Sequence, residues 1–206
     1  MKPEKEDHIY TLYEYRKVPN LPMKALTIFL TLLILVSKTL AQNNPVIVYS
    51  FANNFEDSIQ KPEWMNPNTI SLDEPNNRNH FSRMTAASPY SSGIEVEIPG
   101  DLRRTNFRIS VQGIIRIANS NSNNQVVISI SNGDSAIFWK GMHVPDSTGK
   151  INAWNPFIVS TLVPRSIPVK SKIKIFLWNS DGKDTADVDD LEIKFTEVAF
   201  PSFLPK

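Results

Sequence analysis

The acidic residues that could do chemistry concentrate near the C-terminus of this chain. The stretch DTADVDDLEIKF, residues 184–195, holds four aspartates within seven residues, and the last two lead directly into an alternating apolar pattern. Acids grouped in this way can ligate a metal ion, act as general acid and base, or simply solvate a loop. The residue types alone leave all three roles open.

The alternation assigns the last two aspartates to different sides of a strand. If Leu191, Ile193 and Phe195 face a core, then Asp189 lies on their side and Asp190 on the opposite one. A carboxylate on the core side needs hydrogen bonds or a cation, because burying it unpaired is costly. We therefore expect a specific partner for Asp189.

A second pair of acids, Glu95 and Glu97, alternates with Ile94, Val96 and Ile98. On a strand the two carboxylates share one face about 7 Å apart, which is between the separations typical of retaining and inverting glycosidases. Catalytic pairs more often come from different strands around a cleft. The pattern favours a solvated sheet face, and we assign no catalytic residue.

Beyond residue 41 the chain has only two histidines, His80 and His143, and it has no cysteine. Two separated histidines disfavour a zinc site. No nucleophile elbow is present, although a serine–histidine–aspartate set assembled from distant segments stays open. Calcium suits the acids better because it takes hard oxygen ligands. On spacing alone, however, a solvated acidic turn is narrowly favoured over a calcium site.

The tryptophans are the candidates for ligand contact. Phe176 and Trp178 share one face of a strand pattern with Lys172 and Lys174, while Ile173, Ile175 and Leu177 form the other face. Exposed aromatic rings beside polar groups suit stacking against a flat ligand surface such as a sugar ring. The alternative is a minor core covered by a loop, because most tryptophans are largely buried. The residues that we expect to contact a ligand are Trp139, Trp154 and Trp178.

The elements that must position these residues are strands. From residue 45 onward the hydrophobic pattern alternates, and no window of a dozen residues has a helical period. About ten short strands separated by polar turns predict one all-β domain, an antiparallel sandwich or barrel. Gly113 interrupts the alternation and predicts a bulge or bend. The expected strands are 46–51, 69–72, 80–85, 93–98, 106–117, 125–130, 135–140, 157–163, 172–178 and 188–195.

The N-terminal region has the features of an export signal. Residues 23–36 contain a lysine and then a short apolar run, and 37–41 end in the small residue Ala41. This pattern predicts a signal peptide over 23–41, because the run is short for a bilayer span. An uncleaved signal-anchor is the alternative, and only then would the protein be attached to a membrane by a single pass. Residues 1–22 are interpreted as a mis-assigned or cytoplasmic extension, and 199–206 as a C-terminal tail.

Composition limits the class of partner. From residue 42 onward the chain has 16 Lys and Arg against 17 Asp and Glu, a net charge of −1. Nucleic-acid binding needs a basic face, so we expect no nucleic acid. An exported domain over 42–198 without cysteine has no disulfides, and its stability must come from its core. We expect it in the periplasm, on the cell surface or secreted.

Two motifs stand near the two ends of the expected domain: YSFANNFE at 49–56 near its first strand and VDDLEI at 188–193 in its last. Their order resembles that of jelly-roll carbohydrate-binding modules of the galactose-binding-like type, found on xylanases and glucanases. The family opens with an Asn-x-x-Phe-Glu strand and closes with an Asp-Asp-hydrophobic strand. The resemblance spans nearly all of 45–195, but a glycine-rich first turn is replaced here by Ala52-Asn53-Asn54.

The resemblance implies a jelly-roll β-sandwich with one structural calcium ion that ties the first strand to the last. Carried over to this sequence, the ligands would be Glu56 and Asp190, with Asp189 as the alternative that strand alternation favours. It further implies a non-catalytic domain that binds a polysaccharide or glycoconjugate. Two alternatives are a structural or adhesion domain of the cell envelope and a small hydrolase of jelly-roll fold.

Overall fold

The computed structural model describes residues 46–56, 62–72, 79–119, 122–144 and 150–198, and contacts divide the chain into the units Met1–Asn44 and Pro45–Lys206. The described part of the second unit is built almost entirely of strands, with two short 3-10 helices, η1 (Pro67–Thr69) and η2 (Leu102–Arg104). The expected signal segment and the tail 199–206 lie outside the described residues. The strands are β1 (Ile47–Asn53), β2 (Trp64–Met65), β3 (Ile70–Leu72), β4 (His80–Met84), β5 (Gly93–Glu97), β6 (Phe107–Ile117), β7 (Asn124–Asn132), β8 (Ser135–His143), β9 (Trp154–Val163), β10 (Lys172–Asn179) and β11 (Ala186–Glu197).

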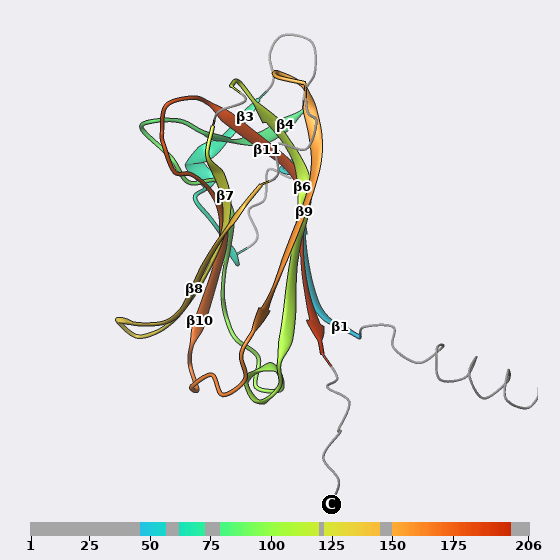
Figure 1. Ribbon diagram of the computed structural model, residues 1–206, viewed down its shortest axis with the longest axis vertical. Helices are drawn as coiled ribbons and strands as arrows, with labels where there is room; N and C mark the ends of the chain where they lie inside the picture. Colours follow the sequence, from blue (N-terminus) through green and yellow to red (C-terminus); the bar gives the residue numbers. More distant parts are fainter. Residues whose placement is uncertain (1–45, 57–61, 73–78, 120–121, 145–149, 199–206) are drawn as a thin grey trace, which may run out of the picture. The chain divides into compact units, whose positions relative to one another are not determined.

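The strands form two antiparallel sheets that face each other (Figure 1). The six-stranded sheet has the order β3-β4-β11-β6-β9, and β1 pairs with the second half of β11 beside β4. The five-stranded sheet has the order β2-β5-β10-β7-β8. The amide of Glu197 donates to the carbonyl of Val46 at 3.1 Å, so the first and last described strands lie side by side. The all-β sandwich expected from the alternation is confirmed.

The core lies between the sheets and is filled by alternate residues of the long strands. Ile173, Ile175 and Leu177 of β10 are fully buried there, opposite Leu191 and Ile193 of β11 in the other sheet. The intervening residues face outward, as a strand period of two requires. This rule places Phe176 and Trp178 on the outer face of the five-stranded sheet.

The bend expected at Gly113 is not in its own strand. β6 runs without interruption from Phe107 to Ile117, and the register shifts instead on its partner β11, between Asp189 and Glu192. A β-carbon at Gly113 would lie 2.9 Å from the carbonyl oxygen of Asp189 and 3.3 Å from the Phe157 ring. Glycine therefore marks the place where the bulged strand approaches closely.

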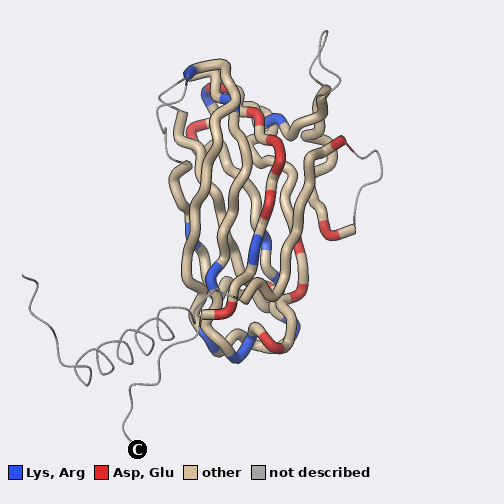
Figure 2. Tube along the Cα trace, turned by 90° about the vertical axis from the view of Figure 1, so that its right-hand side faces the viewer, with Lys and Arg blue, Asp and Glu red and all other residues tan. Residues whose placement is uncertain are grey.

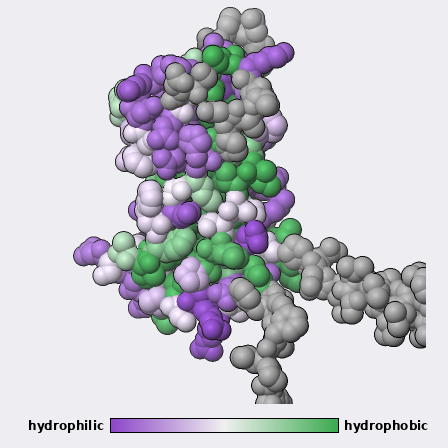
Figure 3. Space-filling view, viewed as in Figure 1, coloured by the Kyte–Doolittle hydropathy of each residue, from purple (hydrophilic) through white to green (hydrophobic). Residues whose placement is uncertain are grey.

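Eleven strands are present in the described residues instead of about ten. The strand that the pattern missed is β2, whose two residues pair with Gly93 and Ile94 of β5 and are too few to show a period. Charges of both signs are interspersed along the sandwich (Figure 2), and apolar surface is broken into patches among polar surface (Figure 3). Among the described residues, no helix has the length and hydrophobicity needed to cross a membrane.

Candidate functional site

Three aromatic-bearing rows cross the outer face of the five-stranded sheet. In the first row Lys174 lies opposite Ser129, which lies opposite Trp139; in the last, Trp178 lies opposite Gln125. The middle row consists of Phe176, Val127 and Gly141, from β10, β7 and β8.

Four aromatic side chains, Tyr90, Trp139, Phe176 and Trp178, share this face, and we call them the aromatic platform. Trp139 is 57% exposed and Tyr90 is 45% exposed, whereas the other two are half-buried. The ring of Tyr90 packs edge-on against Phe176 at 5.5 Å and lies tilted by 31° to Trp178 at 6.3 Å. The platform therefore presents ring surface to solvent, and Tyr90 braces Phe176 and Trp178.

Tyr90 reaches the platform from the loop that precedes β5. It bridges to Trp178, and the next residue fixes the loop against β10: the Ser91 amide donates to the Leu177 carbonyl, and the Leu177 amide donates to Ser91 Oγ, both at 2.9 Å. No alternation covers this loop, so sequence patterns could not place Tyr90. Only its aromatic type signalled a role.

Glycine at 141 gives Trp139 room to lean over the sheet. A β-carbon at Gly141 would lie 3.0 Å from Cη2 of Trp139 and 2.3 Å from Oε1 of Gln125. Both side chains thus extend over the glycine, and Val127 next to it is buried although it faces outward. The indole of Trp139 keeps one surface on the sheet and the other toward solvent.

Hydrogen-bonding side chains border the platform at the end where β7 begins. The Asn123 carboxamide oxygen lies 3.1 Å from Nδ1 of His143 and accepts from Nε2 of Gln125 at 3.5 Å. Gln125 also donates to Ser180 Oγ at 3.5 Å. These amide, hydroxyl and imidazole groups are of the kind that orient a hydroxylated ligand beside an aromatic surface.

The acid beside the platform is neutralised by two lysines. Each carboxylate oxygen of Glu95 lies 3.1 Å from an ammonium, one from Lys172 and the other from Lys174. Hydrogen bonds from Lys174 and Lys172 lower the pKa of Glu95. An acid held ionised in this way is unsuited to protonate a leaving group, which a glycosidase requires of its acid.

Trp154 lies on the outer face of the other sheet and does not join Trp139 and Trp178. Its ring lies under the Arg116 guanidinium at 4.7 Å and packs edge-on against Phe81 at 5.9 Å. Arg116 and Arg83 both donate to the buried carboxylate of Asp187. Strand alternation cannot predict which sheet Trp154 joins or which residues it contacts, because it indicates only whether a residue faces outward.

The expected metal ligands lie where β1, β4 and β11 meet. Glu56 accepts hydrogen bonds from the backbone amide of His80 at 2.6 Å and lies 3.1 Å from its ring nitrogen Nδ1. Burial opposes ionisation of Glu56, but the hydrogen bonds from His80 outweigh it and lower the pKa of this carboxyl. Both of these contacts of Glu56 are with His80, the first residue of β4.

Asp189 is the buried acid of this group, with 2% of its surface exposed. It accepts from Nδ2 of Asn79 at 2.8 Å and from the backbone amide of Asp190 at 2.7 Å. Burial raises the pKa of Asp189 to about 6 despite these bonds, and the charges of Asp190 and Glu56 raise it further. No sequence pattern predicts a role for Asn79, which precedes β4 and links the acid to that strand.

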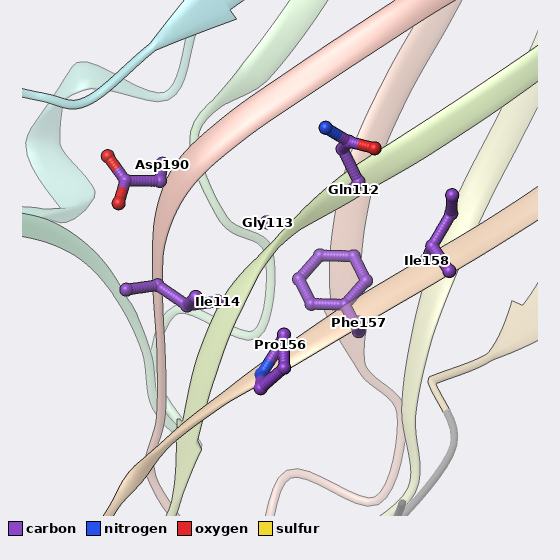
Figure 4. A pocket seen from close by; sticks show the side chains of 7 residues that line it. All are labelled: Gln112, Gly113, Ile114, Pro156, Phe157, Ile158 and Asp190. Atoms are coloured by element: carbon purple, nitrogen blue, oxygen red, sulfur yellow. The ribbon is translucent and has the colours of Figure 1, made fainter.

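Asp190 is exposed and has a positive φ of 49° at the bulge. It borders a hollow of about 600 Å³ on the outer face of the six-stranded sheet, over Gly113 and the Phe157 ring. In Figure 4 its carboxylate points away from that ring. Within the described part of the chain, no three His, Asp or Glu side chains form a metal-ligand group.

Comparisons with known proteins concern the fold. No protein-family model matches the chain, and no curated protein is similar to it. Among solved structures, the chain is similar to the CBM22-1 xylan-binding domain of Xyn10C from Paenibacillus barcinonensis, with a TM-score of 0.42, 12% identity, and coverage of 75% of this chain and 97% of that one. The CBM22-2 domain of the same protein has a TM-score of 0.45 and 15% identity, with coverage of 70% of this chain and 98% of that one. The CBM35 of Abf62 from Cellvibrio japonicus has a TM-score of 0.41 and 10% identity, with coverage of 70% of this chain and 92% of that one.

These solved structures are carbohydrate-binding modules, the class whose motifs the sequence resembles. Because one fold hosts many functions, the fold alone does not identify a ligand of this chain.

Proposed function

We propose that this domain is a non-catalytic module that binds a polysaccharide on the aromatic platform. The observation that carries the proposal is the gathering of four aromatic side chains on one outward sheet face, with Trp139 and Tyr90 about half exposed. Large aromatic surface is normally buried, so its exposure on a braced, polar-bordered face indicates a binding surface. Rings of this kind stack on the apolar faces of sugar units, while the border supplies hydrogen bonds to hydroxyl groups.

The test is retardation of the full-length protein in native gels that contain a soluble polysaccharide. Xylan is the first choice because it is named for several of the similar structures, and β-glucan, mannan and pectin complete the panel. We expect retardation by at least one of them. Retardation by none would contradict the proposal.

The variants Trp139→Ala and Trp154→Phe form a matched pair for this test. Removal of an anchoring aromatic from a binding surface typically costs more than 1 kcal/mol, so we expect Trp139→Ala to weaken binding on the order of tenfold. Trp154→Phe changes a tryptophan of the other sheet and should bind as the wild type does. Equal loss in both variants would argue against the platform.

The same polysaccharides separate a binding module from a hydrolase. Glu95 is ionised and paired with two lysines, so it lacks the proton that a general acid must supply. We expect no new reducing ends after prolonged incubation of the protein with a retarding polysaccharide. Release of reducing ends that Glu95→Gln abolishes would make the protein an enzyme.

We further propose that calcium joins Glu56 and Asp189 where β1, β4 and β11 meet. Asp189 is buried, has no ion-pair partner among the described residues, and its pKa is raised by burial and then by neighbouring acids, as expected of a carboxylate that needs a cation. Calcium takes carboxylate, amide and carbonyl oxygens, which Glu56, Asp189 and Asn79 could supply. Asp190 is exposed, so Asp189 is the stronger candidate ligand.

Removal of calcium should lower the midpoint of thermal unfolding, and Asp189→Asn should reduce this dependence. A variant that keeps the whole wild-type response to calcium would refute a ligand role for Asp189.

We also propose that the domain is exported after cleavage near Ala41. Sequencing the N-terminus of the exported protein should then begin at about Gln42, whereas recovery of the intact chain in membranes would indicate an anchor.

A further inference from the structure

Three buried oxygen atoms lie without a hydrogen-bond donor at one corner of the five-stranded sheet. They are Oδ1 of Asn124, Oδ1 of Asn179 and Oδ1 of Asp181, and no donor among the described residues reaches them. The two asparagines are 3% and 1% exposed. Nearly all buried polar atoms in folded proteins have a partner, so three acceptors left together need an explanation.

The two asparagines face each other on the inner side of the sheet. Asn124, the first residue of β7, pairs with Asn179, the last residue of β10. Val126 and Leu177, two positions along each strand, are fully buried in the core, so the asparagine side chains also point inward. Directly opposed residues of an antiparallel pair have β-carbons about 5 Å apart, close enough to share one ligand.

The nitrogen atoms of both side-chain amides set their orientation, since the Ser122 hydroxyl that accepts from Asn124 gives its own proton to the Asn119 carbonyl oxygen at 2.9 Å. Nδ2 of Asn124 donates to Ser122 Oγ at 2.9 Å, and Nδ2 of Asn179 donates to the carbonyl oxygen of Asp184. Exchanging oxygen and nitrogen in Asn179 would set two acceptors against each other. The oxygen of Asn179 therefore remains the atom without a donor.

Asp181 joins the same corner through the backbone next to Asn124. Its Oδ2 accepts from the amide of Asn123 at 3.3 Å, which leaves Oδ1 without a donor. The neighbouring Ser180 is also tied there, since its amide and its hydroxyl both donate to the carbonyl oxygen of Asn123. The loop that follows β10 is thus held against the start of β7.

We propose that this corner is a second calcium site, formed by Oδ1 of Asn124, Asn179 and Asp181. Calcium prefers oxygen ligands from amides, carboxylates and backbone carbonyls, and it needs acceptors with no competing donor. A single water molecule has only two hydrogens to offer three acceptors.

The site differs from the Glu56–Asp189 group in its ligands and in its sheet. It lies directly behind the aromatic platform, because Gln125 and Trp178 are the outward neighbours of Asn124 and Asn179 in their strands. Bound calcium would hold the ends of β7 and β10 together beneath these two side chains. If the proposed glycan binding holds, calcium should also tighten it, but the metal test below needs no glycan.

The experiment measures thermal unfolding of the full-length protein in chelator and in excess calcium, for the wild type, Asp181→Asn and Asp189→Asn. At a calcium concentration about 100 times the dissociation constant, one site should raise the midpoint by about 5 °C or more. We expect each variant to lose part of the wild-type rise and to keep the part that belongs to the other site. Asp181→Asn in chelator should be at least as stable as the wild type, because its new amide can donate to a bare oxygen.

Two results would overturn the second site. One is a calcium response of Asp181→Asn equal to that of the wild type, which would mean that water and not calcium contacts these three oxygen atoms. The other is complete loss of the response in Asp189→Asn, which would assign all calcium binding to the Glu56–Asp189 group. As a gain-of-binding control, Asn124→Asp should lower the midpoint in chelator and enlarge the rise with calcium.

Discussion

At the scale of single residues, the two sheets use their outward side chains differently. On the five-stranded sheet Trp139 stays 57% exposed over Gly141, whereas Trp154 on the other sheet is covered by Arg116. Trp139 lies in the middle of β8 and Trp154 at the start of β9, but only the first offers free ring surface. Exposure and bracing therefore distinguish a binding residue from a packing residue better than its type does.

Asp189 gives the clearest pH prediction. Its pKa is about 6 in the folded protein, above the ordinary value of 3.8, so the folded state binds more protons than the unfolded state between these values. In chelator, the contribution of Asp189 to the free energy of unfolding should therefore be greatest below pH 4. It should fall by at most about 3 kcal/mol as the pH rises through 6. Denaturant unfolding from pH 4 to 7 measures it.

The control is Asp189→Asn, which cannot titrate and should lack this part of the pH dependence. Calcium should also weaken the dependence in the wild type, because a bound cation favours the ionised carboxylate. Identical pH profiles for the wild type and the variant in chelator would contradict the environment described for Asp189.

At the scale of elements, neighbouring strands turn separate residues into surfaces. The platform draws on β8, β10 and the loop before β5, and antiparallel register brings Trp139 and Lys174 into one row through Ser129 of β7. The bulge in β11 places two neighbouring acids in different environments, since Asp189 is buried and Asp190 is exposed. Register and bulges thus decide which functional groups meet.

Gly141→Ala tests the platform as an arrangement of strands. Its β-carbon would meet only the ends of two side chains, Gln125 Oε1 and Trp139 Cη2, and these can move without disturbing the backbone. We expect polysaccharide affinity to fall on the order of tenfold, as for loss of a binding aromatic, while the unfolding midpoint changes little. Unchanged affinity would show that the position of Trp139 over the glycine is unimportant.

Gly113→Ala tests the bulge opposite β6. Its β-carbon would meet backbone, the Asp189 carbonyl at 2.9 Å, so the strands must separate. Overpacking of this kind typically costs about 1–3 kcal/mol, which denaturant unfolding would measure. Gly133→Asn is the matched control, because nothing lies within 4 Å of that turn position and asparagine tolerates its positive φ of 56°. Equal stability of the two variants would contradict the close approach.

Sequence patterns predict more of the fold than of the candidate site. Alternation predicted nearly all the strands and placed Phe176 and Trp178 on an outward face, because burial on one side imposes a period of two. It cannot tell which sheet a strand joins, so it cannot separate Trp154 from Trp139 and Trp178. It was also silent for Tyr90 and Asn79, which lie outside any regular pattern and are positioned by tertiary hydrogen bonds.

At the scale of the whole molecule, the sandwich separates its roles by layer. The core between the sheets provides stability without disulfides, and the outer face of the five-stranded sheet carries the aromatic platform. The outer face of the other sheet carries the Asp187 ion pairs and the hollow over Gly113. A ligand that binds the platform should therefore leave the six-stranded sheet unperturbed.

The four tryptophans make this separation measurable in one experiment. We suggest fluorine NMR of the full-length protein labelled with 5-fluorotryptophan, titrated with the polysaccharide that retards it most strongly, with Trp→Phe variants to assign the four signals. The account predicts that the signals of Trp139 and Trp178 shift with saturation, while those of Trp64 and Trp154 stay in place. A shift of Trp154 without Trp139, or no shift with any polysaccharide of the panel, would contradict it.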